Sequence, residues 1–194
     1  MATCTRISFP ACTPDPRPAV GAAGTFEDIA MIEQQFKEAM GRFAGAVTAI
    51  TTFANEQPAG LIATAVCSLS AEPPSVIVCI NKTASAHDLI LNNGYFGVSL
   101  LAPAHAHVVN RFNTSKGAER FAVEDWALGN GKAPVLRNAP VGMVCRIGNC
   151  FDGFSHTIFV GLIESISLCE PELNECLLWK GRGLHQAIEY VANR

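Results

Sequence analysis

Charged residues are scarce in this sequence. Only 16% of its 194 residues are charged, against roughly 25% in ordinary domains. The 14 Lys and Arg residues do not outnumber the 17 Asp and Glu residues, so the chain has no basic excess with which to neutralise phosphates, and we expect no nucleic-acid partner. Apolar residues make up 49% of the chain, which excludes disorder for most of it. So much apolar surface must be buried in a large core or against another copy, and we expect an oligomer.

A membrane span and an export signal are also missing. The longest uncharged run, residues 89–110, contains Asn, His, Gly and Pro residues that a lone membrane helix could not satisfy. The N-terminus has no apolar stretch of the about 7 to 15 residues that a secretory signal needs. Its four prolines between positions 10 and 18 predict a disordered extension over residues 1–24, followed by one domain over residues 25–194. We expect a soluble cytoplasmic protein with no membrane partner.

Paired cysteine motifs are absent although the chain has eight cysteines. No two of them have the spacing of a zinc or thioredoxin-like site, so no metal is expected. Disulfides are unfavourable in a chain without an export signal. Cys67, Cys79 and Cys145 lie inside apolar runs, which predicts that they are small buried side chains.

The hydrophobic pattern predicts a helix followed mainly by strands. Ile29, Ile32, Phe36 and Met40 recur at helical spacing, which predicts a helix over residues 25–40; Thr25 and Asp28 resemble a capping box at its start. Stretches rich in Val, Ile and Thr follow at intervals too short for crossover helices, so we expect antiparallel pairing. The predicted strands are 46–53, 61–70, 75–80, 95–101, 141–150, 157–168 and 177–179.

Three further helices and one long excursion complete the expected fold. Helices are predicted over 85–93, over 103–112 and at the C-terminus, where Gly181 and Gly183 lead into it; residues 113–138 are expected to run over the surface. The pattern is typical of a mainly β fold with flanking helices, an antiparallel barrel. The strand at 75–80 is apolar on both faces, so its outer face must be covered, most simply by a second copy.

The usual catalytic and nucleotide-binding motifs are absent, including a Rossmann fingerprint and a P-loop. The informative stretch is 61–85. There Thr64, Ser68 and Ser70 bring hydroxyls to an apolar strand, and the small Ala63 and Ala65 would let a flat ligand approach the backbone. The following residues 81–85 (NKTAS) combine hydroxyls, a cation and the start of a helix, which suit a phosphate. An ordinary hairpin followed by a capped helix explains the same residues without a ligand.

This stretch resembles the flavin-binding segment of the split-barrel flavin reductases, the reductase components of two-component flavin monooxygenases. Other segments resemble the same family in the same order. They are 41–48 (GRFAGAVT), 119–121 (ERF) ahead of Trp126, 155–161 (SHTIFVG) and 179–182 (WKGR). Together they cover roughly residues 36–184.

The resemblance implies a homodimeric, antiparallel Greek-key split barrel that binds FMN or FAD near the subunit interface and takes a hydride from NADH or NADPH. The flavin ring would lie along the backbone of Thr64, Ala65, Val66, Cys67 and Ser68. The ribityl chain and phosphate would contact Asn81, Lys82, Thr83 and Ser85. Arg182 is a further candidate for a phosphate or nicotinamide contact.

The resemblance places His156 beside the flavin, where the nicotinamide stacks. Hydride transfer needs no acid or base at the nicotinamide carbon, so this candidate catalytic residue would position the nicotinamide or tune the flavin rather than move protons. A structural histidine at a strand start remains an alternative. The family often has Gly-Asp-His or Gly-Ser-His here, whereas this chain has Gly153-Phe154-Ser155-His156, with one residue inserted or shifted.

The function implied is that of an NAD(P)H:flavin oxidoreductase that supplies reduced flavin to a monooxygenase. Two alternatives stay open. A flavin-dependent cobalt-corrinoid reductase of the same fold would keep its flavin bound, and a non-catalytic flavin-binding protein would not oxidise NADH at all. The sequence distinguishes neither FMN from FAD nor NADH from NADPH.

Overall fold

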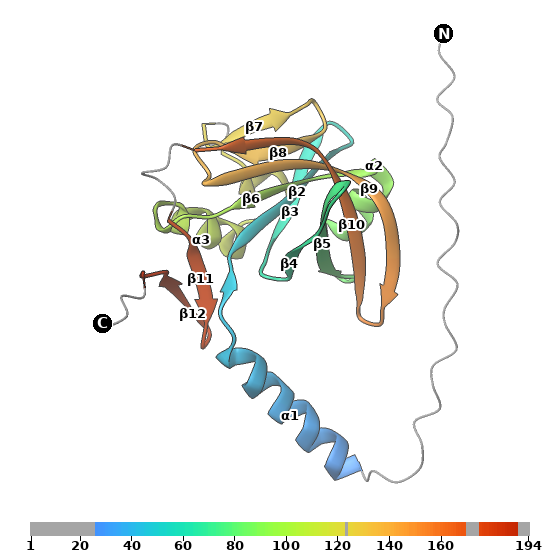
Figure 1. Cartoon of the computed structure of the whole chain (residues 1–194), viewed down its shortest axis with the longest axis vertical. Coiled ribbons are helices and arrows are strands. Elements are labelled where there is room, and N and C mark those ends of the chain that lie inside the picture. The colour runs from blue at the N-terminus through green and yellow to red at the C-terminus, as the bar shows by residue number, and fades with distance from the viewer. Residues whose placement is uncertain (1–25, 123, 170–174, 190–194) are drawn as a thin grey trace.

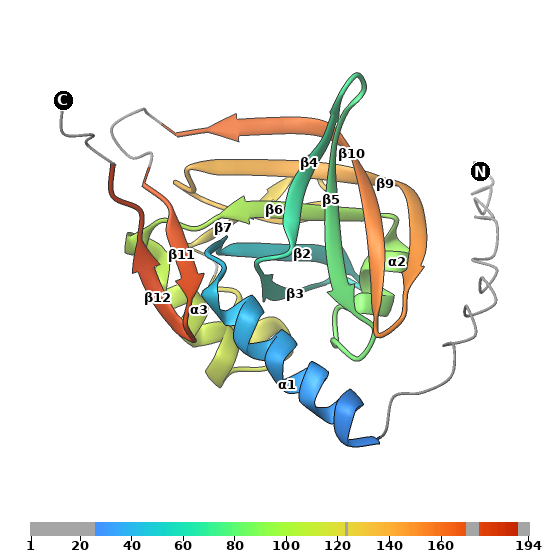
Figure 2. The same cartoon turned by 60° about the horizontal axis from the view of Figure 1, so that its bottom comes forward.

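One antiparallel sheet organises the molecule. The structure is a computed structural model that describes residues 26–122, 124–169 and 175–189. The sheet has seven strands in the order β3-β2-β6-β9-β10-β5-β4, and all neighbours are antiparallel. It curls into a barrel (Figures 1 and 2). Its strands are β2 (Thr48–Ala54), β3 (Gln57–Ala63), β4 (Val66–Ala71), β5 (Pro74–Asn81), β6 (Tyr95–Leu100), β9 (Val141–Gly153) and β10 (His156–Leu168).

Smaller elements flank this barrel. β1 (Gly45–Ala46), β11 (Leu177–Lys180) and β12 (Gly183–Gln186) form a three-stranded sheet, and β7 (Trp126–Gly129) pairs with β8 (Ala133–Leu136). The helices are α1 (Phe26–Arg42), α2 (His87–Asn93) and α3 (Ala106–Thr114), with short 3-10 turns η1 (Pro103–His105) and η2 (Gly117–Arg120). The predicted mainly β fold with flanking helices is confirmed, and α1 projects away from the barrel in both views (Figures 1 and 2).

Two buried clusters hold the fold together. The first fills the barrel and includes Ile50, Val78, Phe96 and Phe159. The second joins β2, β7, β8 and β11 to α3. Its aromatic part consists of Phe112, Phe121 and Trp126, whose ring centroids lie 4.9 to 6.0 Å apart. Segment 113–138, predicted to be a surface excursion, therefore closes one end of the core.

Arg120 fixes this segment to the barrel. Its guanidinium donates hydrogen bonds to the carbonyl oxygens of Gly60 (2.9 Å) and Ser115 (3.0 Å) and lies 5.5 Å from the ring centroid of Phe112. The Glu119-Arg120-Phe121 segment, which carried part of the family resemblance, thus has a structural role in this chain.

In the region 61–93, two elements of the structure differ from those predicted from the sequence. The single strand predicted over 61–70 is divided, because β3 pairs with β2 and β4 pairs with β5 at opposite edges of the sheet. The helix predicted from residue 85 begins at His87, with Ala86 as its N-cap. Ser85 therefore does not cap it. At the first helix, the suggested capping residue Thr25 lies outside the described residues, as does the extension 1–24.

The predicted C-terminal helix is wrong for residues 183–189. Gly181 and Arg182 both have positive φ angles, 58° and 66°, and two such residues make a tight hairpin turn. The chain therefore reverses, and β12 pairs with β11. Residues 187–189 are not helical, and residues 190–194 are outside the described part.

Gly161 is required by close packing inside the barrel. A Cβ there would overlap the Phe96 ring and approach the Cβ of Cys145, and both neighbours are fully buried. We expect Gly161→Ala to cost about 2 kcal/mol of stability, or roughly 4 to 8 °C in Tm for a chain of this size. Calorimetry measures this, with Gly41→Ala as the matched control because a Cβ there meets no atom within 4 Å. Equal Tm values for the two variants would contradict the packing argument.

Candidate functional site

A pocket of about 420 Å³ opens where the β3–β4 junction meets the ends of β5 and β10. Its volume lies within the range of sites for small ligands. Its walls combine apolar side chains with few polar ones. The lining residues are Val47, Leu61, Ile62, Ala63, Thr64, Ala65, Cys79, Asn81, Val109, Asn113, His156, Trp179 and Leu184.

The β3–β4 junction forms one wall with little side-chain bulk. Register pairs end at Ala63 and resume at Val66, so Thr64 and Ala65 belong to neither strand, and both are exposed. The Ala65 carbonyl still accepts a hydrogen bond from the Cys79 amide (3.0 Å), which holds the junction against β5. This stretch of backbone is therefore accessible to a flat ring, and the contact with a flavin at residues 64–68 stays a prediction.

The end of β5 supplies a polar turn. The Asn81 side-chain oxygen accepts hydrogen bonds from the Thr83 amide (2.9 Å) and the Thr83 hydroxyl (2.8 Å). This arrangement fixes the loop that begins at Lys82. The Asn81 and Thr83 side chains thus orient each other, and the loop has this conformation without a bound ligand.

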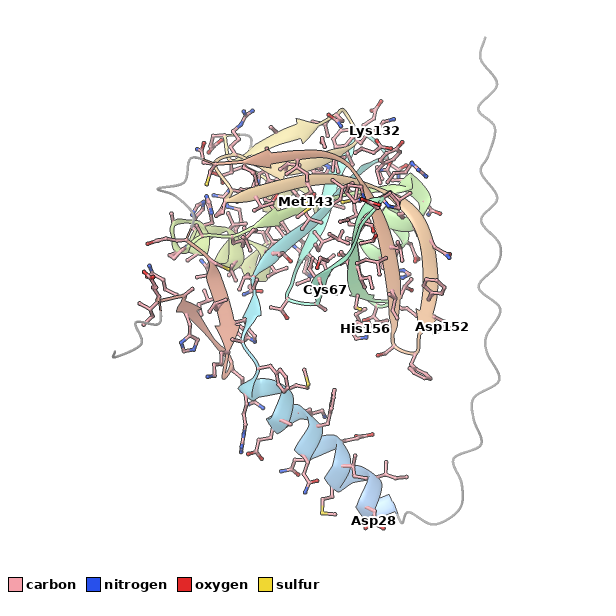
Figure 3. All side chains as sticks on the ribbon, viewed as in Figure 1. Asp28, Cys67, Lys132, Met143, Asp152 and His156 are labelled. Atoms are coloured by element: carbon pink, nitrogen blue, oxygen red, sulfur yellow. The ribbon has the colours of Figure 1, made fainter. Side chains whose placement is uncertain are left out.

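His156 lies directly opposite Asn81 in the β10–β5 register, and opposed residues project from the same face of a sheet. The two side chains therefore enter the pocket together from neighbouring strands. Nδ1 of His156 lies 2.9 Å from the Ser155 hydroxyl, which orients the ring. Figure 3 shows His156 close to the tip of the β9–β10 hairpin.

An ion pair ties the hairpin tip to the Lys82 loop. The Lys82 ammonium donates a hydrogen bond to the Asp152 carboxylate (3.0 Å), and the Lys82 amide donates to the Ser155 carbonyl (3.0 Å). The hydrogen bond from Lys82, followed by that from the Phe154 amide, lowers the pKa of Asp152. The carboxylate therefore stays charged at neutral pH, and the cation is held beside the pocket.

The structure brings together only some of the predicted site residues. Thr64, Ala65, Asn81 and His156 line the pocket. The other predicted residues do not line it. Val66, Cys67 and Ser68 continue along β4. Lys82, Thr83 and Ser85 lie in the exposed loop after β5, and Arg182 lies in the exposed β11–β12 turn.

Several lining residues were not predicted from the sequence. Trp179 and Leu184 come from the β11–β12 hairpin, which the predicted C-terminal helix concealed. Asn113 and Val109 come from α3. Of these four residues, only Trp179 lies in a segment that carried the family resemblance, residues 179–182. The resemblance pointed to Arg182 in that segment and not to Trp179.

A second, larger hollow of about 520 Å³ runs beside β7, β8 and β9. It contains none of the predicted site residues, and the guanidinium of its one charged lining residue, Arg137, already donates to the Trp126 carbonyl (3.1 Å). We assign the functional site to the smaller pocket because Thr64, Ala65, Asn81 and His156 line it, whereas no predicted site residue lines the larger one.

The cysteines differ in accessibility, which the sequence did not predict. Cys145 is buried as expected, Cys79 is half-buried in the pocket wall, and Cys67 is exposed. Burial raises the pKa of the Cys145 thiol to about 12, so almost none of it is thiolate at pH 8. We expect iodoacetamide at pH 8 to modify Cys67 at least about tenfold faster than Cys145 in the folded protein. Peptide mapping by mass spectrometry measures both rates, and equal rates would contradict the burial assignment.

A curled antiparallel sheet with a pocket at its β3–β4 junction defines the class as a split barrel, and the family follows from comparison with known proteins. The profile described as "Flavin reductase like domain" matches residues 40–187. This chain belongs to the flavin reductase-like family, as the sequence predicted.

Individual relatives agree with this assignment. The chain is 36% identical to an FMN reductase (NADH) RutF from Stutzerimonas stutzeri, over 80% of this chain and 88% of that protein. Among solved structures it resembles the Streptomyces globisporus NADH:FAD oxidoreductase SgcE6, with a TM-score of 0.73 and 28% identity over 81% of this chain and 94% of the other. It also resembles BorF, the flavin reductase component of a bacterial two-component tryptophan halogenase, with a TM-score of 0.73 and 25% identity over 81% and 99%. The predicted split-barrel fold and the prediction of a flavin reductase are confirmed.

Proposed function

We propose that this chain transfers a hydride from NADH to FMN and that the pocket at the β3–β4 junction is where the transfer occurs. The observation that carries this proposal is the pairing of an exposed backbone wall at Thr64–Ala65 with His156 and Asn81 across one pocket. The choice of FMN and NADH follows the names of the relatives that are FMN reductases (NADH). FAD remains the second candidate, because SgcE6 is named for it.

The residues present fit a flavin. The small side chains at Ala63 and Ala65 leave room for a flat ring, and backbone amides of this junction would donate to the ring edge, which becomes electron-rich on reduction. The loop at Lys82 offers a cation and hydroxyls for a phosphate. Flavin, when bound, supplies the redox chemistry by accepting the hydride from the nicotinamide. His156 would orient the nicotinamide over the ring from its place in the pocket wall.

The active form is a homodimer in this proposal. The outer face of β5 and β10 is apolar but only half-buried at Ile77, Cys79, Ile158 and Val160, and these residues form one face because Ile158 is opposite Cys79 and Val160 is opposite Ile77. The stripe formed by Ile29, Ile32, Phe36 and Met40 on α1 is also exposed, with values between 48% and 63%. Solvated apolar area on this scale is typical of an interface.

The reduced flavin is released to a partner monooxygenase. The support is that BorF is a flavin reductase component of a two-component halogenase and that the pocket is open at the surface, since Trp179 and Leu184 in its wall are 42% and 39% exposed. A cytoplasmic location is supported by Cys67, Cys79, Cys145 and Cys176, none of which forms a disulfide within the described part of the chain. No helix in the described ranges is long and apolar enough to cross a membrane.

Anaerobic and aerobic assays on the purified protein test this function. We expect NADH oxidation that depends on added FMN and rises with its concentration, together with bleaching of the flavin's visible band. Bleaching of a tightly bound flavin without turnover of free FMN would instead favour a dedicated acceptor such as a cobalt corrinoid. Flavin binding without NADH oxidation would leave a non-catalytic flavin-binding protein.

A further inference from the structure

The tip of the β9–β10 hairpin carries an aromatic residue in a conformation that does not suit it. Gly153 and His156 are paired, so Phe154 and Ser155 form a two-residue turn, and positive φ falls only on the first of them, at 64°. Such a turn strongly favours glycine at its first position. A bulky side chain there is strained by about 1 to 2 kcal/mol.

Packing within the described structure does not explain this residue. Phe154 is 83% exposed, so its ring gains almost nothing from burial within the chain. The strained backbone at Phe154 is therefore not offset by packing of its side chain. Because the residue lies near the pocket, this indicates that the ring contacts a molecule other than its own chain.

The tip is held rigidly beside the pocket. The Phe154 amide donates to the Asp152 carboxylate (2.8 Å), and Lys82 binds the same carboxylate oxygen (3.0 Å). Two residues further on, His156 lines the pocket, and two residues span at most about 7 Å. The Cα of Phe154 therefore lies within about 7 Å of the Cα of His156, and Figure 3 shows His156 near the tip of this hairpin.

The size of the pocket limits how much of the bound cofactors it can enclose. At about 420 Å³ it is near the lower end of the range for one drug-sized ligand. It cannot enclose a flavin and a whole dinucleotide together. If the nicotinamide is beside His156, the remainder of the pyridine nucleotide, including its adenine ring, must lie outside the pocket.

We propose that Phe154 is a stacking platform for the adenine ring of the pyridine nucleotide and so sets affinity for the dinucleotide rather than the rate of hydride transfer. This inference rests on the function proposed above. An aromatic face binds a flat base well, and a rigid tip reduces the ordering cost of binding.

The test compares two hydride donors in four proteins. The donors are NADH and reduced nicotinamide mononucleotide, which lacks the adenosine. The proteins are the wild type, Phe154→Gly, Phe154→Leu and Phe154→Tyr. We expect Phe154→Gly to raise the KM for NADH about tenfold, with kcat, FMN affinity and the KM for the mononucleotide unchanged. Phe154→Tyr should retain the wild-type KM, and Phe154→Leu should not, because it keeps apolar bulk but has no aromatic face.

Other outcomes overturn the assignment. An unchanged KM for NADH in Phe154→Gly removes any role in nucleotide binding, and an equal loss with both donors places the contact at the nicotinamide end. A wild-type KM in Phe154→Leu excludes stacking, and dissociation of Phe154→Gly into monomers would make the residue an interface contact. Because glycine relieves the strained turn, misfolding is not expected, and an unchanged or higher Tm confirms this. A wild type that does not oxidise NADH refutes the proposed function instead.

Discussion

Replacing Ala65 by Phe should abolish FMN binding without unfolding the protein. Ala65 is exposed and lines the pocket at the β3–β4 junction, so a benzyl group there occupies the surface on which the flavin ring would lie. We expect FMN affinity to fall by at least about 100-fold, which corresponds to about 2.7 kcal/mol. Equilibrium titration of flavin absorbance or fluorescence measures the change.

Ala71→Phe is the matched control for this change. Ala71 is exposed at the far end of β4 and does not line the pocket, so the same substitution should leave both FMN affinity and Tm as in the wild type. Wild-type FMN binding by Ala65→Phe would show that the flavin lies elsewhere.

The second large effect is expected on the dimer. Ile32 and Phe36 on α1 are 61% and 63% exposed, so charges placed there cannot disturb the barrel core. Burial of each side chain against a second copy is worth about 1.5 to 3 kcal/mol. The double variant Ile32→Glu/Phe36→Glu should therefore weaken dimerisation by at least about 100-fold and reduce FMN-dependent NADH oxidation with it, as light scattering and activity at matched concentrations will measure.

The control places the same charges elsewhere on α1. Gln34 and Gln35 lie off the apolar stripe at helical spacing, so Gln34→Glu/Gln35→Glu adds two negative charges to the helix without entering the proposed interface. It should remain dimeric and active. A double variant at Ile32 and Phe36 that stays dimeric would contradict the role of the stripe.

Much of the barrel could be predicted because its strands carry local signals. The stretch 75–80 alternates between residues buried in the barrel, such as Val76 and Val78, and outer residues, such as Ile77. The position at which β3 gives way to β4 could not be predicted. Residues 61–70 contain no glycine, proline or charge, and the division arises only because the two halves pair at opposite edges of the sheet.

The C-terminal hairpin could not be predicted from the sequence for a different reason. Its turn depends on a positive φ at Arg182, a conformation that an arginine rarely adopts. Gly181 and Gly183 alone therefore did not indicate that the chain makes a hairpin turn here. The consequence reaches the site, because Trp179 and Leu184 enter the pocket only when this hairpin forms.

The candidate site was predicted through the family resemblance more than through the residues themselves. Asn81 and His156 are 75 positions apart in the sequence and meet only through the β5–β10 register. Such long-range pairing leaves no local pattern. Conversely, Cys67 lies in an apolar run but is exposed because β4 is an edge strand, so apolar neighbours alone did not predict its burial correctly.

The most direct test of the central claim is a crystal structure of the protein with FMN bound. The account predicts the flavin ring against the backbone of Thr64 and Ala65, with its phosphate near Asn81 and Lys82 and His156 at the side open to nicotinamide. Flavin bound in the 520 Å³ hollow beside β7 and β8, or anywhere apart from the junction pocket, would contradict it.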